Sequence, residues 1–122
     1  MANEVTFNGS IVIRSGFLNE QIQPGSITID LASDIGDGGV QAIGFSAHEA
    51  LPTANAGDGG LYFFRNLDPT NFIEVGLDDG GSFVAFLKLL PGEYSIGRLS
   101  SSAIYAKADT AESDLQYRML SA

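Results

Sequence analysis

Apolar and polar residues alternate along most of this chain, with the period of two that is typical of β-strands. The first alternating run contains Val5, Phe7, Ile11 and Ile13, with Gly9 between its two halves as a candidate β-bulge. Further runs cover residues 27–31, 43–47, 61–67, 72–77, 83–89, 94–99, 103–108 and 115–120. This spacing predicts about eight to nine short strands.

Glycine-containing turns separate the predicted strands. Asp-Gly and Gly-Gly pairs supply the positive φ angles of tight hairpins, and the chain contains 15 glycines. The clearest hairpin joins residues 72–77 to residues 83–89 through Asp78–Gly81. One segment, Ala106 to Leu115, is a candidate for a short turn of helix that Thr110 would cap. The other predicted turns are Pro24-Gly25, Asp37-Gly38-Gly39, Asp58-Gly59-Gly60 and Pro91-Gly92.

Length and composition are those of one folded domain. The chain has 122 residues, of which 44% are hydrophobic and 17% charged, so it carries enough apolar material for a core and is not expected to be disordered. Many short strands with half-apolar faces are expected to form two sheets that pack on each other. We therefore expect an all-β protein with one antiparallel β-sandwich domain over residues 1–122, jelly-roll-like in form.

The charge balance argues against nucleic acid and membrane partners. Fifteen acidic residues oppose six basic ones, which gives a net charge of −9. A nucleic-acid binder needs clustered cations to displace counterions from phosphates, whereas the six basic residues here are scattered singly. An anionic membrane surface would repel the chain, and its most apolar segment, Phe83 to Leu90, is short and contains Lys88. The start, MANEVTF, has no basic n-region, so we expect synthesis in the cytoplasm.

Candidate chemistry is sparse. The chain has no cysteine, and its one histidine, His48, has no catalytic partner in a recognised motif. Any two of Glu49, Glu74 and Glu93 could in principle form the carboxylate pair of a glycosidase. A chain of this length is small, however, for the deep cleft that such an enzyme needs. Gly57-Asp-Gly-Gly lacks the spacing of a phosphate loop and its Lys-Ser/Thr. We expect no enzyme activity and no cofactor.

Two acidic loops leave calcium open as an alternative. Asp34, Asp37, Asp78 and Asp79 offer the hard oxygen ligands that calcium prefers, but neither loop has EF-hand spacing. Asp before Gly is also the ordinary turn dipeptide. We therefore expect no metal site.

Two predicted strands carry apolar residues on both faces. Leu61-Tyr62-Phe63-Phe64 and Phe83-Val84-Ala85-Phe86-Leu87 place side chains toward the core and away from it. The second face of each strand can be covered within the monomer or by another chain. In a chain with few layers, this pattern favours oligomerisation.

The second half of the chain carries a family resemblance. The segments are Arg65-Asn-Leu-Asp-Pro-Thr-Asn-Phe-Ile-Glu-Val-Gly76, Gly80-Gly-Ser-Phe-Val-Ala-Phe-Leu-Lys-Leu-Leu-Pro-Gly-Glu93, Ile104-Tyr-Ala-Lys-Ala-Asp-Thr110 and Asp114-Leu-Gln-Tyr117. In this order they resemble small virion structural proteins of tailed bacteriophages, over roughly residues 57 to 120. The resemblance implies a β-sandwich virion component without catalytic residues, either a capsid cement (decoration) protein or a fibre or spike domain.

The function expected from this resemblance is that of a capsid decoration protein. It would bind the major capsid protein on the capsid exterior as a homotrimer at three-fold positions. The alternative is a tail or neck fibre or spike domain that adsorbs to a host-surface glycan or protein, and a small hydrolase or lectin is a third reading. The candidate partner-binding residues are Ala2, Asn3, Glu4, Val5 and Phe7 near the N-terminus, and Asn66, Asp68, Pro69 and Asn71 in a loop.

Overall fold

The computed structural model describes residues 4–33, 35–55, 60–101 and 103–122, and within them the chain is all β. These described residues form twelve strands and no helix, so the all-β prediction is confirmed and the number of strands exceeds the expected eight to nine. All strand pairs are antiparallel. The chain divides into two compact units, Met1–Ala32 and Ser33–Ala122, which are described separately below.

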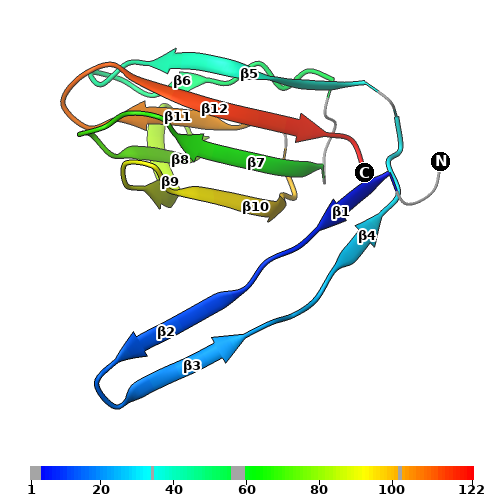
Figure 1. The fold of residues 1–122 in the computed structure, drawn as a ribbon. Coiled ribbons are helices and arrows are strands. Elements are labelled where there is room, and N and C mark those ends of the chain that lie inside the picture. Colours follow the sequence, from blue (N-terminus) through cyan, green and yellow to red (C-terminus); the bar gives the residue numbers. More distant parts are fainter. Residues whose placement is uncertain (1–3, 34, 56–59, 102) are drawn as a thin grey trace. The chain divides into compact units, whose positions relative to one another are not determined.

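The first unit is a two-stranded ribbon made from one long hairpin. Its strands are β1 (Val5–Phe7), β2 (Ile11–Ser15), β3 (Leu18–Ile22) and β4 (Ile27–Ile29). β1 pairs with β4 and β2 pairs with β3, so residues 5–29 run out and back along one ribbon, called the ribbon arm below (Figure 1). The two-residue loop at its tip begins with Gly16, whose φ of 57° is the left-handed conformation that tight hairpins need.

The second unit consists of two four-stranded sheets. The first has the order β10-β7-β12-β5 and the second the order β6-β11-β8-β9 (Figure 1). Their strands are β5 (Gly36–Ile43), β6 (Glu49–Ala50), β7 (Leu61–Asn66), β8 (Ile73–Asp79), β9 (Ser82–Leu89), β10 (Tyr94–Arg98), β11 (Tyr105–Ala108) and β12 (Ser113–Leu120).

One hydrophobic core joins the two sheets. Phe64 of β7 and Leu115 of β12 come from the first sheet, and Ile73 and Val75 of β8 come from the second, all with 0% of their surface exposed. Alternation along β12 is regular, with Ser113, Leu115, Tyr117 and Met119 buried and the residues between them exposed. The two sheets therefore pack face to face, in a sandwich-like arrangement.

Four connections between the sheets lie at the same end of this unit. They are residues 44–48, 67–72, 90–93 and 109–112, and each joins a strand of one sheet to a strand of the other. The register places them together, because the end of β5 at Ile43 is opposite the start of β12 at Ser113, and Tyr94 at the start of β10 is opposite Arg65 near the end of β7. These four connections are called the corner loops below.

A β-bulge interrupts the hairpin of β8 and β9. The register shifts between Val75 and Gly76, so that Val75 is opposite Leu87 and Gly76 is opposite Ala85. Phe86 is the extra residue, and 45% of its surface is exposed. A side chain at position 76 would begin 2.2 Å from the backbone oxygen of Val84. The close approach of these two strands therefore requires glycine.

Several local predictions were wrong. Asp37, Gly38 and Gly39 lie inside β5 and pair with β12, because a long partner strand supplies hydrogen bonds that local turn preference cannot outweigh. Residues 45–47 were expected in a strand but follow β5 as a bend. The candidate helix from Ala106 to Leu115 is the end of β11, a corner loop and the start of β12.

The bulge expected at Gly9 is also misplaced. Residues 8–10 lie between β1 and β2, and the extra residue is on the returning side, where residues 23–26 separate β3 from β4. The strand Leu18–Ile22 was not predicted, because its polar centre hides the alternation. Turn glycines Gly25, Gly80, Gly81 and Gly92 have positive φ angles, as expected, while Asp58 and Gly59 lie outside the described residues.

Candidate functional site

Asn66 holds the corner loops together. Its side chain has no exposed surface; Nδ2 donates to the backbone oxygens of Asn71 at 2.8 Å and Leu89 at 3.0 Å, and Oδ1 accepts from the backbone N–H of Asp68 at 2.8 Å. Its backbone N–H donates to the oxygen of Glu93, and its backbone oxygen accepts from Gly92. Asn66 thus links two corner loops and the end of β9. The structure therefore gives this buried residue a role in holding the loops in place.

Asp68 organises the exposed part of the same loop. Its Oδ2 accepts from the backbone N–H groups of Thr70 at 2.9 Å and Asn71 at 2.6 Å, and from Thr70 Oγ1 at 3.2 Å. Thr110 Oγ1, on another corner loop, donates to Asn71 Oδ1 at 2.9 Å. The hydrogen bonds from Asn71 and then Thr70 lower the pKa of Asp68 below its ordinary value of 3.8, because they favour the charged carboxylate.

The stabilising effect of Asp68 should depend on pH. Because its pKa is lower in the folded chain than in the unfolded one, its contribution is present above pH 4 and is lost as the pH falls through the folded-state pKa. We expect Asp68→Ala to lower the urea midpoint of unfolding slightly at pH 7, and the gap to the wild type to shrink at pH 3. Asp68→Asn keeps an acceptor oxygen but has no titrating carboxylate. Its urea midpoint should therefore lack the part of the pH dependence that Asp68 causes. A gap that stays constant from pH 7 to pH 3 would contradict the assignment.

The residues expected at the N-terminal contact lie on the first unit. Val5 and Phe7 are half-buried on β1, and Glu4 is exposed just before it, while Ala2 and Asn3 lie outside the described residues. Asp68, Pro69 and Asn71 are at the corner loops of the second unit, where Pro69 is exposed. Partner binding by these two groups stays a prediction.

His48 sits in a cluster that sequence reasoning missed. Its Nε2 lies 2.7 Å from Asp78 Oδ1, its ring stacks on Phe83 at a centroid distance of 5.3 Å, and Tyr105 meets it edge-on at 5.4 Å. Phe83 is opposite Asp78 across β8 and β9, so the cluster forms where the second sheet presents its outer face. The stacking and the pairing with Asp78 orient the ring and account for this residue structurally.

The candidate acidic residues are spread over separate interactions. Glu49 accepts from Gln41 and from the backbone of Gly44, Glu93 accepts from the backbone of Leu90, and Asp37 accepts from Asn55. Glu74 lies opposite Lys88 and Lys107 on its neighbouring strands. No group of three or more residues that could hold a metal ion occurs within residues 4–33, 35–55, 60–101 and 103–122, and Asp34 lies outside them.

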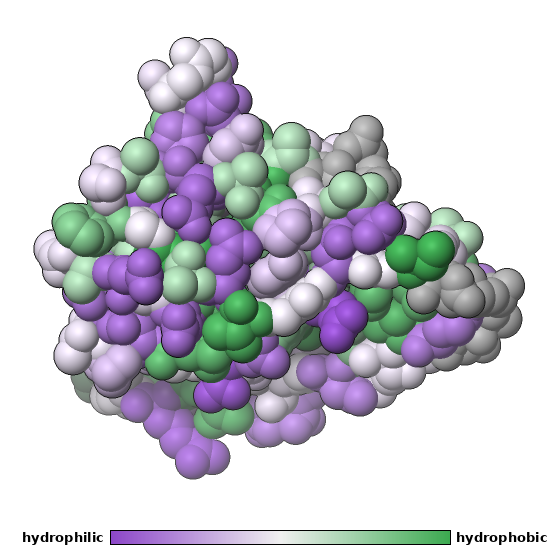
Figure 2. Space-filling model, turned by 90° about the horizontal axis from the view of Figure 1, so that it is seen from above, coloured by the Kyte–Doolittle hydropathy of each residue, from purple (hydrophilic) through white to green (hydrophobic). Residues whose placement is uncertain are grey.

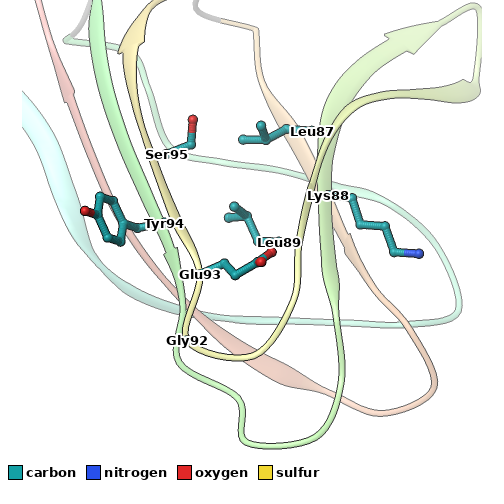
Figure 3. A pocket seen from close by; sticks show the side chains of 7 residues that line it. All are labelled: Leu87, Lys88, Leu89, Gly92, Glu93, Tyr94 and Ser95. Carbon is teal, nitrogen blue, oxygen red and sulfur yellow. The ribbon is translucent and has the colours of Figure 1, made fainter. Parts of the chain in front are cut away.

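A groove runs between the edge strands of the two sheets. It has a volume of about 440 Å³ and lies where β9 ends and β10 begins. Leu87, Leu89 and Ser95 point into it, while Lys88 and Tyr94 point away (Figure 3). The groove, called the β9–β10 groove below, is lined by Leu87, Lys88, Leu89, Gly92, Glu93, Tyr94 and Ser95.

The ribbon arm carries an apolar face that is also exposed. The register of β2 and β3 puts Ile11, Ile13, Leu18 and Ile22 on one face of the ribbon. Phe17, in the tip loop, is fully exposed, and no described residue in 4–32 is buried. The sequence signal was partial: Gly16-Phe17 fits a two-residue hairpin loop after residues 11–15, but the polar centre of residues 18–22 hides the second strand.

Exposed apolar residues also occur away from the ribbon arm and from β9 and β10, for example Val40 and Leu67. On the face drawn in Figure 2, hydrophobic residues form small separate groups among hydrophilic ones. Scattered apolar residues of this kind are normal on a protein surface. The described part of the chain contains no helix that could cross a membrane.

Comparisons with known proteins found no relative. No family model matches the chain, and neither a curated protein nor a solved structure does so. The function is therefore argued from the chain itself.

Proposed function

We propose that this chain is a structural protein of a tailed-bacteriophage virion, a capsid cement protein that binds the major capsid protein on the capsid exterior. It would act as a homotrimer at three-fold positions, with a jelly-roll-like sandwich as its body. The virion assignment comes from the resemblance of residues 57 to 120, and the binding role comes from the ribbon arm.

The ribbon arm is the observation that carries a binding role. A two-stranded ribbon is only marginally stable alone in water, since it has no second layer to cover its apolar face. Here Ile11, Leu18 and Ile22 are each about half exposed, and Phe17 is fully exposed. An apolar ribbon of this length gains stability when another protein surface covers it. The arm is therefore suited to contact a neighbouring subunit.

The second unit supplies a stiff body for that contact. Two corner loops are connected by the hydrogen bond from Asp109 N–H to the oxygen of Phe72 and by that from Thr110 to Asn71. Leu67 N–H also donates to the oxygen of Asp114 in β12. A net charge of −9 keeps many copies soluble and away from DNA. The mechanism is mechanical: contact area added across subunit boundaries raises the free energy needed to separate them.

Thermal release of packaged DNA tests the stabilising role. Virions that carry this protein would be stripped of it, and half would be restored with the purified chain. We expect the stripped virions to release DNA at a temperature several degrees lower, and the restored ones to recover. Equal release temperatures in the two samples would exclude the stabilising role.

A fibre or spike domain for host adsorption is the second candidate. Tyr94 is 64% exposed and stacks on Phe63 at a centroid distance of 6.2 Å, and it lies opposite Arg65. An exposed tyrosine that stacks on a half-buried phenylalanine beside an arginine can stack on a sugar ring and bind its polar groups. Copy number separates the two candidates, since a cement protein is present in hundreds of copies per virion and a fibre in a few dozen at most.

A further inference from the structure

The β9–β10 groove is an incompletely covered part of the hydrophobic core. Its floor includes Leu89, which belongs to the core, and Leu87, which packs against the core and is half-buried. Its two walls are edge strands, because β9 ends one sheet and β10 ends the other. Edge strands with apolar surface beside them are normally covered, and within the described residues of the second unit no further strand pairs with either of them.

Exposed apolar side chains continue along the same two strands and the turn between them. Val84 and Phe86 of β9 are 49% and 45% exposed, and Leu90 in the turn is 49% exposed. Ile96 of β10 is also exposed. Together with the groove they make the β9–β10 edge the more apolar edge of the second unit, suited to an apolar occupant.

The tip of the ribbon arm matches this groove in size and chemistry. It presents Phe17 in the two-residue loop and Leu18 in the last pair of β2 and β3, opposite Ser15. A volume of about 440 Å³ lies in the range of pockets that hold compact apolar groups.

Charge also favours this pairing in a strongly acidic chain. Two copies of net charge −9 repel each other, and this repulsion is weakest between surfaces whose charge is locally balanced. Residues 5–29 contain one cation, Arg14, and one anion, Glu20, and are neutral. Residues 82–98 contain Lys88, Arg98 and Glu93, and have a net charge of +1. The arm and the groove edge thus avoid the acidic excess, which lies in the rest of the chain.

We propose that the tip of the ribbon arm of one copy seats Phe17 and Leu18 in the β9–β10 groove of a second copy. Each copy has one arm and one groove, so the contact can repeat head-to-tail from copy to copy, and such a repeat forms a ring when its rotation closes. A ring of three is the homotrimer of the proposed function, on which this inference rests for its number of copies. Exchange of the arm would cover apolar surface on both partners at once.

Cysteine pairs test the contact directly, because the natural chain contains no cysteine. One preparation would carry Phe17→Cys and the other Ser95→Cys, and the two would be mixed under mild oxidation. We expect a disulfide-linked heterodimer, since a disulfide forms only when the two Cα atoms come within about 7 Å. The matched control pairs Phe17→Cys with Val40→Cys, an exposed position on β5 at the opposite edge of the first sheet. A yield no higher than that of the control would overturn the proposal.

Solution mass tests exchange without introduced cysteines. Light scattering after size exclusion should give about 38 kDa for the full chain, three times its 12.8 kDa. Phe17→Ser should weaken the assembly at least tenfold and return the mass to that of one chain, while Val40→Ser should not. Because Phe17 is fully exposed, its replacement leaves the hydrophobic core between the two sheets intact. A wild-type mass equal to that of one chain would overturn the exchange of arms between copies.

These outcomes are separate from that of the proposed function. If the wild type is monomeric and the cysteines fail to pair, but the chain still raises the DNA-release temperature of virions, the arm exchange is wrong and the cement role stands. If the trimer and the disulfide form but virions gain no stability, the exchange stands and the cement role fails.

Discussion

Replacing Asn66 by alanine is expected to lower the melting temperature by roughly 10 °C or more. The substitution removes two donated hydrogen bonds and one accepted one, each contributing about 1 kcal/mol net. It also leaves the backbone oxygens of Asn71 and Leu89 and the N–H of Asp68 without these partners beside a small cavity. We therefore expect a loss of about 3 kcal/mol or more in the free energy of unfolding.

Two further variants make this prediction specific. Asn66→Asp keeps the size and one acceptor oxygen, but it turns a carboxylate toward the carbonyls of Asn71 and Leu89, so it should destabilise at least as much. Asn71→Ala, in the same loop, keeps the backbone oxygen that Asn66 binds and should cost far less. The expected drop is roughly 10 °C. A melting temperature of Asn66→Ala within about 2 °C of the wild type would mean that the corner loops hold together without the Asn66 side chain.

Gly76→Ala is expected to destabilise the second unit by about 3 kcal/mol, near the upper end of overpacking costs. The added Cβ would lie 2.2 Å from the oxygen of Val84 and 2.7 Å from the Cα of Ala85. Both are backbone atoms, so no side-chain rotation can relieve the clash, and β8 and β9 must separate at the bulge. Urea unfolding measures the loss, and faster hydrogen exchange at the β9 amides would locate it.

The control for Gly76→Ala is another glycine of the same unit. At Gly44 the added Cβ would lie 3.4 Å from Glu49 Oε2, the end of a flexible side chain, and the backbone there is not in the left-handed region. Gly44→Ala should therefore change the urea midpoint little. Equal midpoints for the two variants would show that the bulge adapts to a side chain, contrary to the close approach of the strands.

Two features of the second unit explain why the sequence predicted it well in outline. Residues 113–120 alternate strongly, and the structure forms β12 there, because alternation reports which face a strand buries. The apolar run at residues 61–64 likewise lies in β7. Residues 36–43 show where prediction from local patterns fails. Asp37-Gly38-Gly39 is a strong turn signal, but eight cross-strand pairs with β12 hold it extended. Such pairs connect residues at least 70 positions apart, so local preferences cannot show them.

The candidate contact residues were likewise predictable only in part from the sequence. Asp68, Pro69 and Asn71 could be selected as loop residues from turn chemistry alone, but the burial of Asn66 depends on Asn71 and Leu89, which only the fold brings to it. The ribbon arm was partly visible in its alternating residues, yet its exposed tip at Phe17 depends on the pairing of β2 with β3.

By itself, the sequence determined the strand-rich character of this protein, its acidic charge and most of its turn positions, because these follow from local periodicity, composition and the φ angles open to glycine. The tertiary structure decided which strands pair, where the two sheets leave a groove and which apolar residues stay exposed. Those properties depend on contacts between distant residues, and the free energy of such contacts comes from burial that no local pattern specifies.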